Sequence, residues 1–281
     1  MKKLLLEGGA QRSLFTAGVL DYFLEKDLNF DQAYGISAGA LTAVSYKSKD
    51  KGRNLVQMEK FADDHRYISF ANWLKTQSVF GWDFLFNEIP DKYLPINKEE
   101  FKKNPLELFA GAYNAQDGTM KYFPVTDFDD PRAKLALQAT SSLPIFTKLC
   151  MIDGIPYADG GVGDSFALSQ FKDDQAKYVM VLTRDITYQK DETKEPGYLR
   201  VLYANYPHLV QDYLKRAITY NDELMRIEHL EKTGQMFVIR PSKPVTVSRV
   251  EKDKVKLKDL YDDGYKTAEK LYPRLIAYLT K

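Results

Sequence analysis

Residues 35–39 read Gly-Ile-Ser-Ala-Gly, a Gly-x-Ser-x-Gly pattern that can present a serine as a nucleophile. Small residues on both sides of Ser37 allow the chain to turn sharply and push the hydroxyl into a site. We expect a strand to end within residues 31–34 and a helix to run over residues 38–47, which is the context that such a turn requires. The amide of Ala38 would then lie at a helix N-terminus, where it could stabilise an oxyanion.

A serine hydroxyl needs a base, because it is a poor nucleophile at neutral pH. The chain has three histidines, His65, His208 and His229. His208 and His229 follow Ser37 in the order of an α/β-hydrolase, but both lie in or beside an expected amphipathic helix instead of a loop after a strand. His65 ends a polar helix. Surface or capping roles suit all three better, and a Ser-His-Asp enzyme using His208 or His229 is the alternative.

An aspartate is the other candidate base. Asp159 lies in Tyr-Ala-Asp-Gly-Gly-Val, residues 157–162, after a short expected strand and before two glycines that allow another backbone to approach. Asp-Gly-Gly is also a common turn, and an aspartate with its ordinary pKa of ~3.9 is a weak base. Asp159 could act only if desolvation raised that pKa and geometry held the carboxylate against Ser37.

Residues 7–13, Glu-Gly-Gly-Ala-Gln-Arg-Ser, form a third segment of interest. Glycines between a strand and a helix expose backbone N–H groups to an anion. The segment lacks the Gly-Lys-Ser/Thr ending of a P-loop and the spacing of a dinucleotide fingerprint. An oxyanion hole formed by Gly8, Gly9 and Ala10 fits better, with Arg12 adding positive charge or tying down the loop.

The elements expected around these segments alternate between strands and helices. A strand at 3–6, a helix from about 13, a strand at 31–34 and a helix at 38–47 predict an α/β protein with a mainly parallel sheet. Hairpins are expected at 106–125 and 149–158, a helix at 131–140, and a buried strand at 178–183.

The last third of the chain changes character. Amphipathic helices are expected at 209–230 and 257–279, with a strand at 236–240 between them. We therefore expect a catalytic domain over residues 1–189 and a C-terminal helical extension over residues 190–281 packed on it. Aromatic residues are dense over residues 67–97, where a core-covering insertion is the favoured interpretation and a lid or acyl-chain pocket the alternative.

The composition of the chain narrows the functions and cellular locations to be expected. The 281 residues are 44% hydrophobic with a net charge of +1, which is ordinary for a globular protein and gives no reason to expect nucleic acid binding. The single cysteine, Cys150, cannot form an intramolecular disulfide, which suits a reducing compartment. No run approaches the ~18 apolar residues of a membrane span, and three leucines are too few for a signal peptide. We expect a cytoplasmic protein; peripheral contact with the inner face of the membrane and the oligomeric state stay open.

Together these segments resemble the patatin-like phospholipase family. Its pattern is a Gly-rich loop with Arg or Lys, then Gly-x-Ser-x-Gly, then Asp-Gly-Gly or Asp-Gly-Ala, matched here by residues 8–13, 35–39 and 159–161 in that order. Residues 139–146, Ala-Thr-Ser-Ser-Leu-Pro-Ile-Phe, are similar to the family's Ala-Ser-x-x-x-Pro segment. The resemblance covers about residues 3–185.

The resemblance implies a three-layer α/β/α fold and a Ser37–Asp159 dyad that hydrolyses lipid acyl esters through an acyl-serine, without metal or cofactor. The Ala38 amide and the loop at 8–10 would stabilise the oxyanion. The C-terminal helices look like those of a bacterial subgroup. A patatin-like domain that only binds lipid or protein is a further alternative. Glu7, Ala10 and Ser13 depart from the family's pattern, and a non-glycine residue at 10 or 13 would be strained if its φ were positive.

Overall fold

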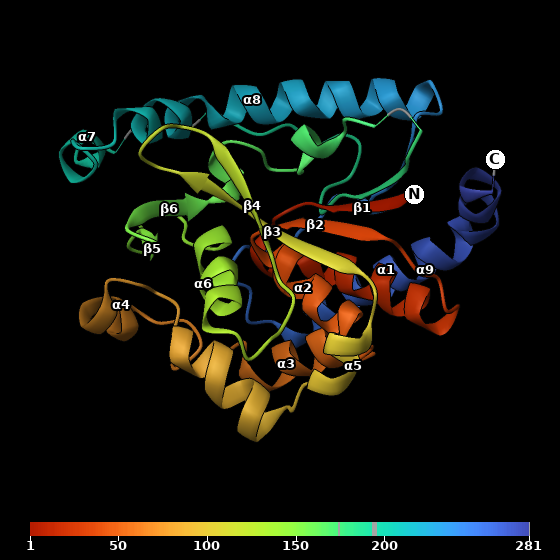
Figure 1. The fold of residues 1–281 in the computed structure, drawn as a ribbon, viewed down its shortest axis with the longest axis horizontal. Coiled ribbons are helices and arrows are strands. Elements are labelled where there is room, and N and C mark those ends of the chain that lie inside the picture. Colours follow the sequence, from red (N-terminus) through yellow and green to blue (C-terminus); the bar gives the residue numbers. More distant parts are fainter. Residues whose placement is uncertain (174, 193–195, 281) are drawn as a thin grey trace.

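The computed structural model describes residues 1–173, 175–192 and 196–280, and within them the centre of the fold is an eight-stranded sheet (Figure 1). The strand order is β5-β6-β3-β2-β1-β7-β8, with β4 paired to β3. Strands β3, β2, β1, β7 and β8 run parallel to one another. Strands β4 and β6 pair antiparallel with β3, and β5 pairs antiparallel with β6. The strands are β1 (Lys2–Leu6), β2 (Gln32–Ile36), β3 (Glu107–Asn114), β4 (Met120–Pro124), β5 (Cys150–Ile152), β6 (Ile155–Asp159), β7 (Lys177–Val181) and β8 (Met236–Ile239).

Helices cover both faces of this sheet, which makes the three layers that the sequence predicts. The long helix α8 runs along one face, and α1, α2, α3, α5 and α9 lie on the other (Figure 1). The α-helices are α1 (Leu14–Glu25), α2 (Ala38–Lys47), α3 (Arg53–Phe61), α4 (Phe70–Thr76), α5 (Lys98–Lys103), α6 (Pro131–Thr140), α7 (Leu199–Leu202), α8 (Pro207–Lys232) and α9 (Lys254–Leu279). The other helical segments are the 3₁₀ turns η1 (Ala10–Ser13), η3 (Gly160–Val162) and η4 (Leu168–Gln170) and the π-helix η2 (Phe84–Tyr93).

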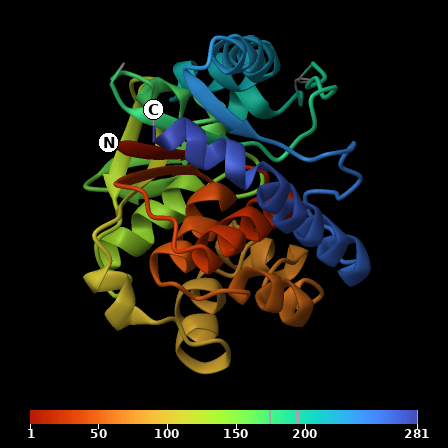
Figure 2. The ribbon, with the colours of Figure 1, turned by 90° about the vertical axis from the view of Figure 1, so that its right-hand side faces the viewer.

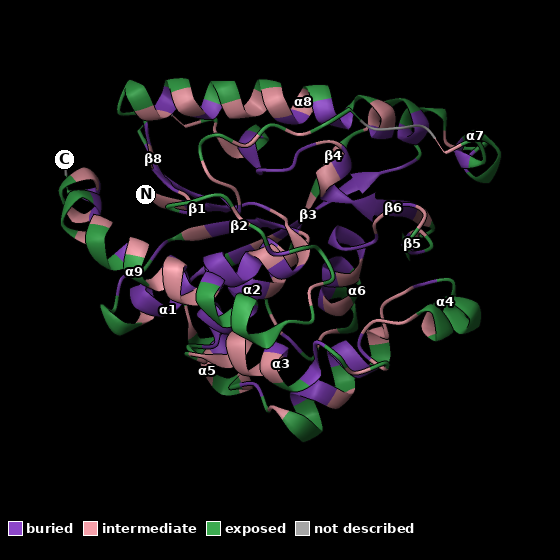
Figure 3. Ribbon diagram, turned by 180° about the vertical axis from the view of Figure 1, so that it is seen from behind, coloured by how far each residue is buried: buried purple, intermediate pink, exposed green. Residues whose placement is uncertain are grey.

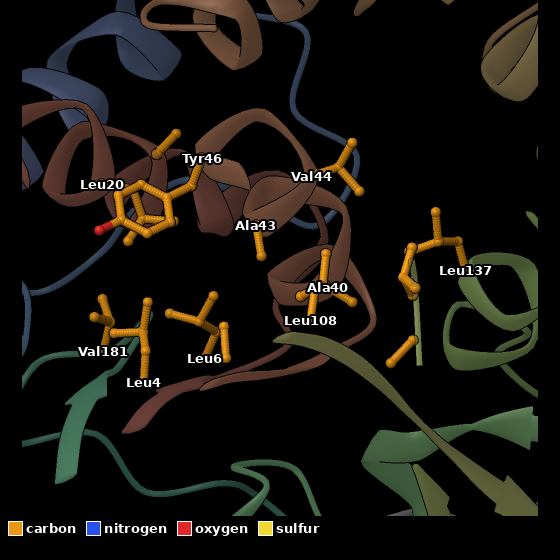
Figure 4. Close-up of a cluster of buried hydrophobic side chains, with 14 of the residues drawn as sticks. Leu4, Leu6, Leu20, Ala40, Ala43, Val44, Tyr46, Leu108, Leu137 and Val181 are labelled. Carbon is orange, nitrogen blue, oxygen red and sulfur yellow. The ribbon is translucent and has the colours of Figure 1, made fainter. Parts of the chain in front are cut away.

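Strand β1 shows how the core forms on both faces of the sheet. Leu4 and Leu6 point to the α1/α2 side, where they pack near Ala40 and Ala43 (Figure 4). Leu5 points to the opposite face and joins the cluster beneath α8. A strand buried on both faces reads as a continuous apolar run, which is why this one needs three successive leucines. Burial is therefore concentrated in the strands and in the helix faces turned toward them (Figure 3).

The C-terminal third is built into this core. Strand β8 extends the sheet beside β7, and α9 crosses α1 on the α1/α2 side (Figure 2). The two helices touch through their backbones, because a Cβ atom placed on Gly18 or Gly264 would lie 2.0 Å from a carbonyl oxygen of the other helix. The predicted C-terminal helices and strand are confirmed, and the division of the chain between residues 189 and 190 stays a prediction.

Local predictions hold along most of the chain. The strands and helices expected around the serine, the two hairpins and the helix at 131–140 are all present, although β2 continues to Ile36, inside the Gly-x-Ser-x-Gly segment. In the aromatic region, Phe84, Phe86 and Ile89 of η2 are buried in the core, as a core-covering insertion requires. In the described part of the chain, no helix is both long enough and apolar enough to cross a membrane.

Candidate active site

Ser37 and Asp159 meet beside the middle of β3. Ile36, the last residue of β2, pairs with Gly111, and Asp159, the last residue of β6, pairs with the next residue, Ala112. Strand β4 pairs with both Gly111 and Ala112 from the other edge. Strands β2 and β6 therefore follow one another along the same edge of β3, and since one is parallel and the other antiparallel to it, their C-terminal ends face each other.

Ser37 occupies a strained turn between β2 and α2. Its φ of 52° and ψ of -128° lie in a region that favours glycine. The flanking glycines are required for space: a Cβ on Gly35 would lie 2.4 Å from the nitrogen of Ala40, and one on Gly39 would lie 2.7 Å from the oxygen of Leu6. The chain therefore turns tightly against β1 and projects the Ser37 side chain from the end of the sheet.

Residues 139–146 hold both halves of the site. The backbone N–H of Ser37 donates to Oγ1 of Thr140 at 2.8 Å, and that hydroxyl donates to the carbonyl of Gly111. The N–H of Asp159 donates to the carbonyl of Ser142 at 2.8 Å. Residue patterns alone did not point to Thr140 or Ser142 as positioning residues, because these contacts join segments far apart in the chain.

Asp159 is 6% exposed, and burial raises the pKa of its carboxyl above the ordinary aspartate value. The Ser37 hydroxyl, the N–H of Gly161 at 2.8 Å, and the charges of Arg216 and Arg249 act in the opposite direction and lower that pKa. The carboxylate thus lies near enough to the Ser37 hydroxyl for the hydroxyl to lower its pKa. A raised pKa makes it a stronger base than a solvated aspartate.

The Gly-rich loop offers some of its backbone donors to a ligand. The N–H of Gly8 is already used, donating to the carbonyl of Ser165 at 3.3 Å. By contrast, no described residue accepts a hydrogen bond from the N–H of Gly9, Ala10 or Ala38, and these residues line the pockets around Ser37. Three backbone N–H groups at these pockets are therefore left without an acceptor among the described residues.

The departures from the family's loop pattern have different consequences. Ala10 has a φ of 51°, in the left-handed region, so a glycine has been replaced where one would be favoured. Ser13 has a φ of −66° and carries no such strain. Arg12 ties the loop down, because its Nε donates to the carbonyl of Val247 at 2.9 Å.

Glu7, the third departure, is a buried anchor at the end of β1. Tyr220 on α8 donates its hydroxyl to Oε1 of Glu7 at 2.6 Å, and Thr183 donates both its N–H and its hydroxyl to Oε2. Burial raises the pKa of Glu7, while these hydrogen bonds lower it. Glu7 thus joins the ends of β1 and β7 to α8 behind the loop.

Two pockets share Ser37 and Ala10 in their walls. One, of about 980 Å³, is largely apolar and is lined in part by Leu41, Met58, Tyr67, Phe80, Trp82, Leu85, Phe86, Phe128 and Leu137. The other, of about 590 Å³, contains Asp159 and several basic side chains. The aromatic stretch at 67–97 therefore contributes both to the core and to a pocket that opens at the serine.

The histidines lie elsewhere. All three are described, and all are exposed: the side chain of His65 is 85% exposed, and His208 and His229 are exposed residues of α8. None of them lines either pocket at Ser37. Cys150 is buried, and burial raises its thiol pKa to about 11. Among the described residues, no three His, Cys, Asp or Glu side chains are grouped as a metal site would need.

Two family models match this chain. A family model described as "Patatin-like phospholipase" matches residues 4–172, and one described as "Domain of unknown function (DUF6363)" matches residues 206–280. The uncharacterized protein YjjU of Escherichia coli (strain K12) is 25% identical over 186 residues, which cover 64% of this chain and 50% of YjjU. The chain thus spans about half the length of this relative.

Among solved structures, VipD from Legionella pneumophila aligns with a TM-score of 0.47 and 13% identity, covering 96% of this chain and 66% of that one. The family model covers more than half of the chain and includes the loop, the serine and the aspartate. The family-model match confirms the resemblance read from the sequence, and the chain belongs to the patatin-like phospholipase family.

Proposed function

We propose that this protein is a lipid acyl hydrolase in which Ser37 is the nucleophile and Asp159 the base. The observation that carries the proposal is the position of the Ser37 hydroxyl beside Asp159, a buried carboxylate in the same pocket whose pKa is raised by desolvation. Family membership supports ester hydrolysis of a lipid in general, and the site supports this dyad over a histidine triad because the described histidines are exposed and outside the pockets.

The reaction follows from this arrangement. Ser37 Oγ attacks the ester carbonyl carbon while Asp159 takes the hydroxyl proton, and the oxyanion accepts hydrogen bonds from the N–H groups of Gly9, Ala10 and Ala38. Collapse breaks the bond to the alcohol oxygen, which takes the proton from Asp159 and leaves. Water then attacks acyl-Ser37 as Asp159 takes a proton, and that proton returns to Ser37 Oγ when the fatty acid is released.

The apolar pocket supports a fatty acyl substrate. Its aromatic and aliphatic walls begin at Ser37, so an acyl chain placed there would bring its carbonyl to the nucleophile. Burying methylene groups is favourable by ~0.8 kcal/mol each, so we expect long acyl chains to be preferred over acetyl esters.

The test is hydrolysis of p-nitrophenyl esters by the full chain. We expect Ser37→Ala and Asp159→Asn each to lower kcat/KM by at least about 1,000-fold, since the two groups act as a unit. The double variant His208→Ala/His229→Ala is the matched control and should keep its activity. Full activity in the Ser37 and Asp159 variants, or loss in the histidine variant, would contradict the dyad. Failure of a fluorophosphonate to label Ser37 would favour a non-catalytic binding domain.

A further inference from the structure

The pocket that contains Asp159 concentrates positive charge. Its wall carries five basic side chains against two carboxylates, in a chain whose net charge is only +1. The basic residues come from four separate places, the loop after β1, the segment after β7, the helix α8 and the segment before α9: Arg12, Arg184, Lys190, Arg216 and Arg249. Such a cluster is costly unless an anion joins it, because like charges repel.

The carboxylates of the pocket are already engaged. Glu7 accepts hydrogen bonds from Tyr220 and Thr183, and Asp159 accepts one from the N–H of Gly161 and lies beside the Ser37 hydroxyl. No described carboxylate forms an ion pair with any of the five basic side chains. The excess charge therefore faces the pocket without a counterion from the described protein.

The strongest evidence for a ligand in this pocket is a buried, unpaired hydrogen-bond donor on Arg216. Arg216 is 9% exposed, and its buried Nε has no hydrogen-bond partner among the described residues. A buried donor left unpaired costs ~1–3 kcal/mol, and more when it is charged. Two neighbours are held in place by backbone carbonyls, Arg12 by Val247 and Arg184 by Val245. The guanidinium groups are thus oriented in advance and keep donors for an acceptor in the pocket.

The aromatic rings of the pocket exclude one common head group. Arg184 lies over the ring of Tyr188 at 4.3 Å, and Lys190 lies over the ring of Tyr220 at 4.4 Å. A quaternary ammonium group such as choline binds on open aromatic faces, and these two are occupied by the protein's own cations. The surrounding positive charge would also repel it. An arginine guanidinium group instead forms paired hydrogen bonds with two oxygens of one phosphate.

We propose that this basic pocket is a head-group subsite. It selects acyl esters whose anionic phosphate carries no positively charged group such as choline. The inference rests on the proposed function, because the two pockets adjoin at the proposed nucleophile, Ser37, together with Ala10 and Arg249. The acyl chain would lie in the apolar pocket, the phosphate among Arg184, Lys190, Arg216 and Arg249, and the ester bond between them at Ser37. A lysophospholipid whose phosphate is a monoester has this distribution of groups.

The experiment compares three esters of one acyl chain, 1-oleoylglycerol 3-phosphate, 1-oleoylglycerophosphocholine and 1-oleoylglycerol, in the same neutral detergent. We expect kcat/KM for the phosphate monoester to exceed that for the choline ester at least tenfold. Arg216→Gln and Lys190→Gln should each reduce the ratio of phosphate monoester to neutral ester by about tenfold or more, the loss of one charge-assisted hydrogen bond. Arg249→Gln, at an exposed position, gives the same test if a buried variant does not fold.

Lys215→Gln is the matched control, since it removes one charge from the exposed side of α8 next to Arg216 and should leave the ratio unchanged. Hydrolysis of 1-oleoylglycerol with no preference for the phosphate ester would overturn the subsite and leave the proposed function intact. Binding of inorganic phosphate without that preference would mark an effector site and would also overturn it.

Absence of turnover with all three esters would contradict the proposed function instead. Titration calorimetry on the Ser37→Ala protein would then test whether the subsite exists. Affinity for 1-oleoylglycerol 3-phosphate at least tenfold above that for the choline lipid would support it, and equal affinities would overturn it.

Discussion

Ser37 and Thr140 lie 103 residues apart in the sequence and are joined by a 2.8 Å hydrogen bond from the serine N–H to the threonine hydroxyl. The same hydroxyl donates to the carbonyl of Gly111, at the point on β3 where the C-terminal ends of β2 and β6 face each other. One side chain therefore satisfies the backbone groups that are left unpaired where the two strands meet. The position of the proposed nucleophile depends on it.

Replacing Thr140 should affect stability and activity together. Thr140→Val keeps the shape but leaves the N–H of Ser37 and the carbonyl of Gly111 unpaired, so we expect a loss of ~2–4 kcal/mol in the free energy of unfolding. We also expect kcat/KM to fall at least tenfold, because the turn at Ser37 loses its attachment to β3 through Thr140. Thr140→Ser retains the hydroxyl and should preserve most of both. Urea denaturation and ester hydrolysis measure the two effects, and wild-type values for the valine variant would contradict this role.

The strain at Ser37 should be visible in its variants. At a φ of 52° and ψ of -128° glycine is favoured over any residue with a Cβ. We therefore expect Ser37→Gly to have a free energy of unfolding ~1–2 kcal/mol above that of Ser37→Ala, with both inactive. Thermal denaturation of the pair is the measurement. Equal stability, or a more stable alanine variant, would show that the turn is not strained.

The raised pKa of Asp159 predicts an acid limb in the pH profile. Catalysis requires the carboxylate, so kcat/KM should fall on acidification at a pH above the ordinary aspartate value of ~3.9. Arg249→Gln removes a charge that lowers this pKa, and should move the limb to higher pH. A limb that stays at the ordinary aspartate pH would argue against a buried base.

The same shift has a consequence for stability. A carboxyl with a raised pKa in the folded protein binds more protons than in the unfolded chain, so its ionisation costs stability as the pH rises from ~3.9 to the folded pKa. Asp159→Asn should therefore stabilise the protein more at pH 7 than at pH 4. Chemical denaturation at the two pH values tests this sign, and equal stabilisation at both values would contradict a raised pKa in the folded protein.

The contact of α1 with α9 should not tolerate a methyl group. Gly→Ala within a helix ordinarily stabilises by ~1 kcal/mol, but a Cβ at Gly18 or Gly264 would lie 2.0 Å from a carbonyl oxygen. We expect each variant to lose ~2 kcal/mol or more as the helices move apart. Lys270→Ala, exposed on α9, should change stability little. Stabilisation of either glycine variant would mean that the helices do not touch in this way.

Head-group preference should depend on pH through Lys190. Burial, and the charges of Arg216 and Arg249, lower the pKa of Lys190 to about 7, while Glu7 and Asp159 act to raise it. The cation is therefore lost as the pH rises past 7, and the preference for the phosphate monoester over the neutral ester should decline from pH 6 to pH 8. Lys190→Arg stays charged and should retain the preference at pH 8. An unchanged ratio in the wild type over this range would exclude a contribution from Lys190.

The secondary structure of this protein and its candidate catalytic residues could be predicted from the sequence. The glycines around Ser37, the apolar run of β1 and the helical spacing before and after them depend on residues close together in the chain, and so the strands, the helices, the sheet type and the candidate pair Ser37 and Asp159 were predicted from them. Only the tertiary structure decided that β2 and β6 share one edge of β3, which brings the pair together. The basic pocket likewise required four distant segments to fold against one another, because proximity of charges is a property of strand and helix packing that no local pattern contains.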